Sequence, residues 1–419
     1  MRRSRRRSLR ASVFSTAVAA LLSLQTASAS NANTPNAALI EKGKYLALAG
    51  NCAACHTTPG GQPFAGGVAF ETPFGKLYST NITPDAQTGI GKWTVEQFGQ
   101  ALRRGVRADG EHLYPVFPYT SFTKITDEDA AALFAYLKSV PAVSFKAPEN
   151  DMSWPYSWRS LMSLWNGMFL DEGPYRADPA KSQEWNRGAY LVEGLAHCSA
   201  CHSPRNALGA ERSSEAMTGG VYTDRVPGDA QRSWSAPNLT SVSHGLGAWS
   251  VGEIAAYLKT GKNSRVVSFG PMNDVIMKST RHLADADVRA MAVYLKSLPA
   301  NEGDVGSPAK DEVISAGSTL YDVHCGTCHL PTGMGADDSG PSLAGGLVVQ
   351  ASDPASLINV ILYGPELPDP PPATKDWQPM EAYGEKLNDD EVAALASFVR
   401  SAWHNKGGAV TAAQVAKQR

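Results

Sequence analysis

The six cysteines of this chain all belong to one pattern that occurs three times. They form Cys52-Ala-Ala-Cys55-His56, Cys198-Ser-Ala-Cys201-His202 and Cys325-Gly-Thr-Cys328-His329, and no cysteine is left over. Two thiols three residues apart on one helical turn can reach the two vinyl groups of a porphyrin, and the adjacent histidine then lies under the iron. C-x-x-C-H is the attachment signature of c-type haem. The pattern predicts three covalently bound haem c groups, with these six cysteines as attachment residues and His56, His202 and His329 as proximal iron ligands.

Other uses of cysteine explain the pattern less well. Three local disulfides would leave the three adjacent histidines without a role. A zinc site would need paired C-x-x-C groups, whereas the groups here are more than 120 residues apart. A thioredoxin-like redox motif needs a βαβ pattern around it, and a threefold occurrence without that pattern argues against it.

The N-terminal segment has the composition of an export signal. The first ten residues hold six arginines, residues 11–24 are small and apolar, and Ala27-Ser28-Ala29 has the A-x-A form of a cleavage site. We therefore expect a signal peptide at residues 1–29, although the arginine run also resembles a twin-arginine signal. The mature protein is expected in the periplasm, either free or peripheral on the outer face of the inner membrane.

The charge of the chain argues against a nucleic-acid partner. The formal net charge is −2, and residues 1–29 hold six arginines and no acidic residue, so the mature value is −2 − 6 = −8. A protein that binds nucleic acid usually carries a basic patch or stripe. No stretch after residue 29 is long and apolar enough to predict a transmembrane helix.

Similar segments surround each motif, which indicates internal repeats. Upstream of each motif lies a short predicted helix with a glycine and an aromatic residue, as in Gly43 and Tyr45. Each repeat closes with an amphipathic helix that follows acidic residues, as expected at a helix N-terminus. These closing helices are predicted at 130–137, 288–295 and 392–399, with Tyr136, Tyr294 and Phe398 at matching positions. The predicted fold is all-α, with three tandem cytochrome c-like domains, each a small helical domain around one covalently bound haem.

The repeats and the segments between them suggest domain boundaries. We predict a signal peptide at residues 1–29, a first cytochrome c domain at 36–145, a linker with an amphipathic Trp/Met helix at 146–180, a second domain at 181–300, a linker at 301–310, a third domain at 311–404 and a polar tail at 405–419. The linker helix is expected over residues 152–169 because Trp154, Trp158, Leu161, Trp165 and Met168 recur at helical spacing. Its apolar stripe would pack the first two repeats together or dock onto another subunit or a membrane surface.

Two methionines are candidates for the sixth ligand of the haem iron, which is usually a methionine in electron-transfer c-haems. Met272 in the second repeat and Met380 in the third each follow a proline and precede the closing helix by a similar distance. Met277 is the alternative in the second repeat. In the third repeat we also expect the carbonyl of Pro341 to accept a hydrogen bond from His329, which would fix the orientation of the imidazole ring. An ordinary turn proline is the alternative role.

The first repeat lacks this distal methionine. It has no methionine between His56 and Tyr136, and Phe117 stands at the expected place. Phenylalanine cannot bind iron, so His112, five residues upstream, becomes the candidate sixth ligand and would give a bis-imidazole haem. The alternatives are a five-coordinate iron, a ligand from outside the repeat, and a loop position for His112.

The chain resembles the three-haem cytochrome c subunit of bacterial membrane-associated dehydrogenases, which act on alcohols, gluconate, fructose, sorbitol or aldehydes. The resemblance covers roughly residues 38–405. It rests on Thr80-Asn-Ile-Thr-Pro-Asp85, Leu113-Tyr-Pro-Val-Phe-Pro-Tyr119, Arg187-Gly-Ala-Tyr-Leu-Val-Glu193, His202-Ser-Pro-Arg205 and Gly270-Pro-Met272. The resemblance implies the same nine cysteine and histidine positions, and distal ligands at Met272 and Met380. Many relatives have methionine in place of Phe117 and a longer C-terminal membrane-binding tail.

The resemblance also implies a function and partners. A catalytic subunit with flavin, pyrroloquinoline quinone or a molybdenum cofactor would oxidise the substrate, and this chain would pass the electrons to ubiquinone or a terminal oxidase. We expect no substrate-oxidising activity of the chain itself, because it contains no dinucleotide-binding fingerprint. The alternatives are a free-standing periplasmic electron shuttle, and a haem enzyme or gas-binding protein that uses an open first haem.

Overall fold

The computed structural model describes residues 37–225, 231–336, 339–367 and 379–419. The predicted signal peptide lies outside these described residues. The described chain is mostly helical, as predicted, but it also contains two small antiparallel sheets that were not predicted. One sheet has the order β1-β2-β3, with strands at Ala69–Thr72, Gly75–Tyr78 and Asp151–Met152, and the other pairs β4 (Gly220–Arg225) with β5 (Gln231–Ala236).

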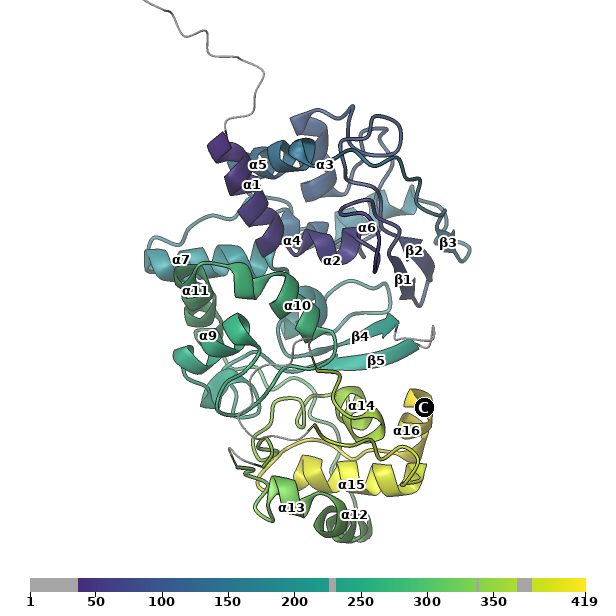
Figure 1. Cartoon of the computed structure of the whole chain (residues 1–419), viewed down its shortest axis with the longest axis vertical. Coiled ribbons are helices and arrows are strands. Elements are labelled where there is room, and N and C mark those ends of the chain that lie inside the picture. The colour runs from purple at the N-terminus through teal and green to yellow at the C-terminus, as the bar shows by residue number, and fades with distance from the viewer. Residues whose placement is uncertain (1–36, 226–230, 337–338, 368–378) are drawn as a thin grey trace, which may run out of the picture. The chain divides into compact units, whose positions relative to one another are not determined.

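Three pairs of helices, one pair in each repeat, pack against each other (Figure 1). In each pair, the helix before the C-x-x-C-H motif contacts the closing helix of the same repeat. The pairs are α1 (Ala37–Ala49) with α5 (Asp127–Ser139), α7 (Gln183–Ala189) with α11 (Asp285–Lys296), and α12 (Asp311–His324) with α15 (Asp389–Ser401).

A glycine makes each of these helix contacts possible. A Cβ atom would lie 1.9 Å from the Ala132 carbonyl oxygen at Gly43, 1.9 Å from that of Ala290 at Gly188, and 2.1 Å from that of Ala394 at Gly317. No real Cβ atom fits at these distances, so only glycine allows the two helices to approach so closely. The same Cβ atoms would also meet the Cβ atoms of Tyr136, Tyr294 and Phe398. The aromatic residues aligned from sequence therefore occupy equivalent places.

Side-chain caps fix the starts of several helices where the sequence predicted them. Thr126 accepts a hydrogen bond from the backbone N–H of Asp129 at the start of α5. A complete capping box begins each of the helices α3 (Val95–Arg104), α9 (Val251–Thr260) and α15. In a capping box, the side chain of the N-cap residue accepts a hydrogen bond from the backbone N–H of the third helical residue, and the side chain of that residue accepts one from the backbone N–H of the N-cap. These local bonds explain why the predicted helix boundaries are close to the observed ones.

The remaining elements connect these helices. In the first repeat they are α2 (Cys52–His56) and α4 (Tyr119–Phe122). In the second they are η1 (Tyr190–Leu195), α8 (Ser199–His202), η2 (Ser213–Glu215), η3 (Leu246–Ala248), α10 (Met272–Lys278) and η4 (Thr280–His282). In the third they are α13 (Gly326–His329), α14 (Ala355–Tyr363) and α16 (Ala412–Gln418).

The linker helix α6 (Leu161–Phe169) is shorter than predicted. Met152 lies in strand β3, where it pairs with Gly75, and turns follow until α6 begins at Leu161. Trp154 is 75% exposed and Trp158 is 56% exposed. The buried residues of α6 are Met162 and Trp165. The predicted helix is therefore wrong for the N-terminal half of the segment, whereas docking of its exposed tryptophans onto a partner or a membrane stays a prediction.

The predicted polar tail contains a packed helix. The side chain of Val415 in α16 is fully buried, and Val410 is nearly so. The hydroxyl of Tyr363 in α14 donates a hydrogen bond to the carbonyl of Gln418, 2.8 Å away. The tail therefore forms part of the third repeat's core.

The first and second repeats share one continuous hydrophobic core and a reciprocal pair of hydrogen bonds. Tyr45 of the first repeat donates to Asp287 of the second over 2.6 Å, and Tyr190 of the second donates to Asp129 of the first over 2.5 Å. Each aspartate lies in the first turn of the closing helix of its own repeat. Each also pairs with a basic residue of its own repeat, Asp129 with Lys42 and Asp287 with Arg187. The two repeats thus contact each other through equivalent residues.

The third repeat joins the second through different residues. The Ser235 backbone N–H donates to the Ser356 hydroxyl over 2.8 Å, and Asn359 donates to the carbonyl of Ser233 over 2.8 Å. Two residues after the contact glycine, where the first two repeats have Tyr45 and Tyr190, the third has Thr319, whose hydroxyl donates to the Ser315 carbonyl of its own helix. Among the described residues, no helix has both the length and the apolar character to cross a membrane.

Candidate functional site

A single large cavity, with a volume of about 2810 Å³, runs through all three repeats. All six cysteines and the three histidines of the C-x-x-C-H motifs line it. Much of the remaining wall is aliphatic and aromatic, as in the first repeat at Ile82, Phe98, Leu102 and Leu133. The structure therefore brings the predicted attachment residues and proximal ligands of all three repeats to one apolar space.

The three motif histidines are oriented in the same way. Nδ1 of His56 lies 2.7 Å from the carbonyl oxygen of Thr80, Nδ1 of His202 lies 2.8 Å from that of Pro237, and Nδ1 of His329 lies 2.9 Å from that of Pro341. A carbonyl oxygen can only accept, so Nδ1 carries the proton and Nε2 keeps a free lone pair for a metal. The Pro341 prediction is confirmed.

The equivalent carbonyls of the first two repeats were not predicted, although a shared motif marks them. Thr80 and Pro237 directly precede Asn81 and Asn238. Each asparagine is buried, and its Oδ1 accepts bonds from the backbone N–H and the hydroxyl of the threonine two residues on. Asn81 Nδ2 donates to the carbonyl of Val143, and Asn238 Nδ2 donates to the carbonyl of Asn301. Each of these carbonyls lies just after the closing helix of its repeat. These bonds fix the turn that presents each carbonyl to its histidine.

Burial sets the protonation of the site residues. It lowers the pKa of His56, His202 and His329, with the hydrogen bond to the carbonyl acting in the opposite direction. Burial also raises the pKa of the Cys52 and Cys198 thiols to about 12. The histidines are therefore neutral, which is the form that binds a metal.

The motifs of the first two repeats lie next to each other. Burial, together with the charge of Cys201 in the second motif, raises the pKa of the Cys55 thiol to about 11. The ring of His197, which precedes the second motif, packs edge-on against Phe122 of the first repeat, with centroids 5.5 Å apart. Burial lowers the pKa of His197, and the backbone of Gly50, just before the first motif, acts in the opposite direction.

The predicted distal methionines both line the cavity. Met272 begins α10, and Met380 follows Pro379, which also lines the wall. Met277, the alternative in the second repeat, is not among the described residues that line it.

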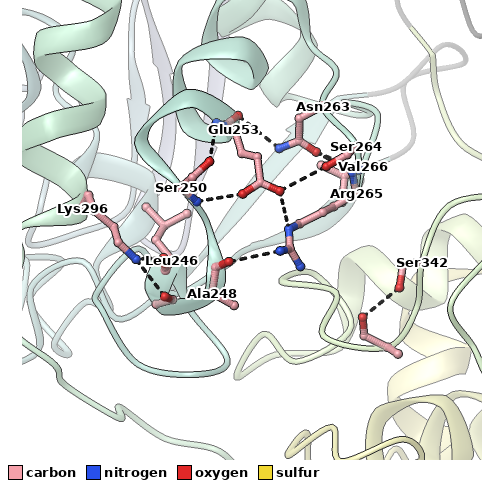
Figure 2. Close-up of polar contacts among 12 residues, drawn as sticks. Leu246, Ala248, Ser250, Glu253, Asn263, Ser264, Arg265, Val266, Lys296 and Ser342 are labelled. Carbon is pink, nitrogen blue, oxygen red and sulfur yellow. Dashed lines mark hydrogen bonds and ion pairs between the residues drawn. The ribbon is translucent and has the colours of Figure 1, made fainter.

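A network of hydrogen bonds holds the loop before Met272 in place (Figure 2). The Glu253 carboxylate accepts from the Ser250 backbone N–H over 2.8 Å and from Arg265 Nε over 2.8 Å. Asn263 donates to the Glu253 carbonyl, and Arg265 also donates to the Ala248 carbonyl. Burial raises the pKa of Glu253, but the bonds from Ser250 and Arg265 outweigh it and hold the pKa at about 2. The network ties the loop to helix α9.

Phe117 occupies in the first repeat the place that Met272 has in the second. The Leu113 backbone N–H donates to the Gly105 carbonyl over 2.7 Å, and the Ser268 N–H donates to that of Gly261 over 2.7 Å. Phe117 and Met272 each lie four residues after these equivalent bonds, and both line the cavity.

The structure does not bring His112 to the cavity wall, since it is not among the described residues that line the space. Its Nδ1 is buried without a hydrogen-bond partner among the described residues, and its carbonyl accepts from Arg159 of the linker over 2.9 Å. Three linker methionines that were not predicted as ligands do line the cavity: Met152, Met162 and Met168.

The residues fit a covalently bound haem c. Each motif supplies two thiols and one neutral imidazole with a free Nε2, and an apolar wall surrounds them, as a porphyrin requires. Another kind of metal centre has less support, because the described residues contain no cluster of three or more His, Cys, Asp or Glu side chains.

Comparisons with known proteins agree with this interpretation. The chain is 43% identical over 373 residues to a nicotinate dehydrogenase component of Pseudomonas putida, covering 87% of this chain but only 30% of that protein. It is 40% identical over 410 residues to the cytochrome c subunit of a quinone alcohol dehydrogenase of Komagataeibacter europaeus, covering 93% of this chain and 86% of the relative. It is 38% identical over 403 residues to the gluconate 2-dehydrogenase cytochrome c subunit of Pantoea cypripedii, covering 92% and 90%.

A model of the cytochrome c family matches three separate stretches of the chain, at residues 40–141, 186–299 and 314–403. Each stretch contains one C-x-x-C-H motif and one pair of packed helices. Together they cover most of the chain, and the family binds haem c covalently. The chain belongs to the cytochrome c family.

Proposed function

We propose that this chain is the three-haem electron-transfer subunit of a periplasmic dehydrogenase complex. The observation that carries the proposal is the single apolar cavity that all three C-x-x-C-H motifs line. Haem c, when bound, would carry one electron on each iron. A shared cavity would bring neighbouring haems together inside one chain, so that electrons could pass between them without a mobile carrier.

The proposal assigns one haem to each of three tandem domains, with the boundaries predicted above. The six motif cysteines would form the thioether bonds, and the three motif histidines would bind iron through Nε2. Met272 and Met380 would be the distal ligands of the second and third haems, supported by their place in the cavity wall. The contact of His197, beside the second motif, with Phe122 of the first repeat supports transfer between the first and second haems.

The names of the relatives support a catalytic partner. The relatives described above include the cytochrome c subunits of alcohol and gluconate dehydrogenases. We infer that a catalytic subunit with flavin, pyrroloquinoline quinone or molybdenum oxidises the substrate and supplies two electrons. Ubiquinone would accept two electrons and two protons, or a terminal oxidase would accept the electrons. The complex would lie in the periplasm, peripheral to the inner membrane.

Two measurements test this proposal. A pyridine haemochrome assay of the mature protein should give three haems per chain, and acid–acetone extraction should leave them on the protein. Two haems or fewer in fully matured protein would refute the three-haem assignment. Purification from the native host should also recover a large catalytic subunit whose substrate reduces the haems. Recovery of the chain alone, in a form that soluble donors reduce, would indicate a free shuttle, and carbon monoxide binding to the reduced protein would indicate an open haem.

A further inference from the structure

We propose that Met162, on the linker helix α6, is the sixth ligand of the first haem, in place of His112. The ligand would thus come from outside the first repeat. The inference rests on the proposed function only in one respect, namely that a haem is attached at Cys52 and Cys55 and bound by His56.

The first repeat lacks its own distal ligand. Phe117 stands where Met272 stands in the second repeat, and its ring cannot bind iron. His112 is the only other histidine between His56 and the closing helix of the repeat, and it does not line the cavity among the described residues. A ligand from another segment is therefore required if the iron is six-coordinate.

Met162 lies next to this distal side. It is only 8% exposed and packs in one cluster with Leu77, Tyr114 and Tyr119 of the first repeat. Phe117 packs against the same cluster, and both Phe117 and Met162 line the cavity. A thioether side chain therefore belongs to the same apolar cluster and the same cavity wall as the ring that replaces the expected methionine.

Helix α6 is fixed to the distal side by three hydrogen bonds. The Tyr119 hydroxyl donates to Asn166 Oδ1 over 2.7 Å, and Asn166 Nδ2 donates to the Arg104 carbonyl over 3.1 Å. Trp165 Nε1 donates to the Leu208 carbonyl of the second repeat over 3.0 Å. These bonds lie three and four residues after Met162, within about one helical turn, so they fix the part of α6 that carries Met162.

The other two linker methionines are weaker candidates. Met168 is 53% exposed, and it lies six residues from Met162, about 240° around the helix, so it points in a different direction. Met152 belongs to strand β3, where it pairs with Gly75. Burial therefore singles out Met162, and this assignment makes all three haems of the chain His/Met haems.

The experiment compares Met162→Leu with the matched control Met168→Leu on the same helix, both in the full-length mature protein. Thioether-to-iron ligation gives a weak far-red band in the ferric protein. We expect three haems to contribute to this band in the wild type and in Met168→Leu, but only two in Met162→Leu. In Met162→Leu, the haem that loses the band should also become high-spin and bind carbon monoxide when reduced. A Met162→Leu band equal to the wild-type band would overturn the inference.

A second measurement does not depend on a variant. In the reduced wild-type protein, the methyl group of an iron-bound methionine lies against the porphyrin face, so ring current shifts its proton resonance far upfield. Three such signals support Met162, because only two other distal methionines are assigned, and two signals overturn it. His112→Ala should leave all three in place. The haemochrome count distinguishes a failure of this inference from a failure of the proposed function. Three haems with only two methionine signals would refute the Met162 assignment alone, whereas fewer than three haems would refute the proposed function.

Discussion

The first and second repeats hold their proximal histidines alike but close the opposite side of the cavity differently. Both use the carbonyl before an Asn-x-Thr turn, and both use a glycine where two helices meet. On the distal side, the second repeat presents Met272 from its own loop, whereas the first presents Phe117 and is covered by α6.

The comparison shows that the proximal half of the site, around the histidine, and the distal half, opposite it, draw on segments of different sequence separation. The proximal half needs only residues within one repeat, because the histidine, its carbonyl acceptor and the helix pair belong together. The distal half of the first repeat requires a helix that follows its closing helix. The first repeat without the linker would therefore lack a complete wall. The Met272 loop belongs to the second repeat itself, and it is also held by the third repeat, because the Gly270 N–H and Asn273 Nδ2 both donate to the Glu366 carbonyl.

The largest effect should come from the glycines where the helices meet. Gly43→Ala and Gly188→Ala both place a Cβ atom 1.9 Å from a backbone carbonyl oxygen, so each should destabilise the protein by about 3 kcal/mol or more. Chemical denaturation and the yield of haem-loaded protein measure this. Gly167→Ala in α6 is the control, because nothing lies within 4 Å of its Cβ position. Tolerance of one variant but not the other would show that the proximal halves also differ.

The next largest effect should come from Met272, the proposed distal ligand of the second repeat. Met272→Leu removes a thioether, which stabilises ferrous iron, so one haem should lose its far-red band and show a lower reduction potential. Spectroelectrochemical titration measures both quantities. Met277→Leu should leave them unchanged, because Met277 is absent from the described cavity wall. An unchanged band in Met272→Leu would mean that the second repeat, like the first, takes its ligand from elsewhere.

A smaller effect should follow from the reciprocal hydrogen bonds between the two repeats. Tyr45→Phe and Tyr190→Phe each remove a hydroxyl that donates to a carboxylate of the other repeat, and each should lower the free energy of unfolding by about 1 to 2 kcal/mol. Urea denaturation should give similar losses for both. Tyr78→Phe, whose hydroxyl bonds no described residue, should be neutral. Unequal losses would contradict the equivalence of the two contacts.

The smallest effect should be the pH dependence of one loop. Glu253 has its pKa lowered from the usual 4.5 to about 2 in the folded protein, so its contribution to stability is complete above pH 4.5 and is lost as the pH falls towards 2. The first repeat has Gln97 at the equivalent cap position. Glu253→Gln should therefore be less stable than the wild type at pH 6, and the difference should shrink on acidification. A constant difference, measured by denaturation at stepped pH, would rule out this role.

Local signals explain what the sequence could predict. The attachment motifs, the capped helices and the Pro341 acceptor each depend on residues close together in the chain. The carbonyls of Thr80 and Pro237 were missed because the histidines they bond lie 24 and 35 residues away. The β1-β2 and β4-β5 hairpins were missed because their strands are short and lie in loops rich in glycine and proline. Met162 was not predicted as a ligand because it lies more than 100 residues from His56, beyond the end of the repeat.

The paired tyrosine and aspartate contacts between the first and second repeats are isologous, because the same two positions meet in both directions. A contact of this kind is what a homodimer of single-repeat chains would form. In such a dimer, any change in one subunit would appear in both, and its two haems would be chemically identical. Joining the copies in one polypeptide removes that constraint, since only one segment runs between them. The connecting helix can cover the site of the first repeat alone, which gives an otherwise symmetric pair two distinguishable ends.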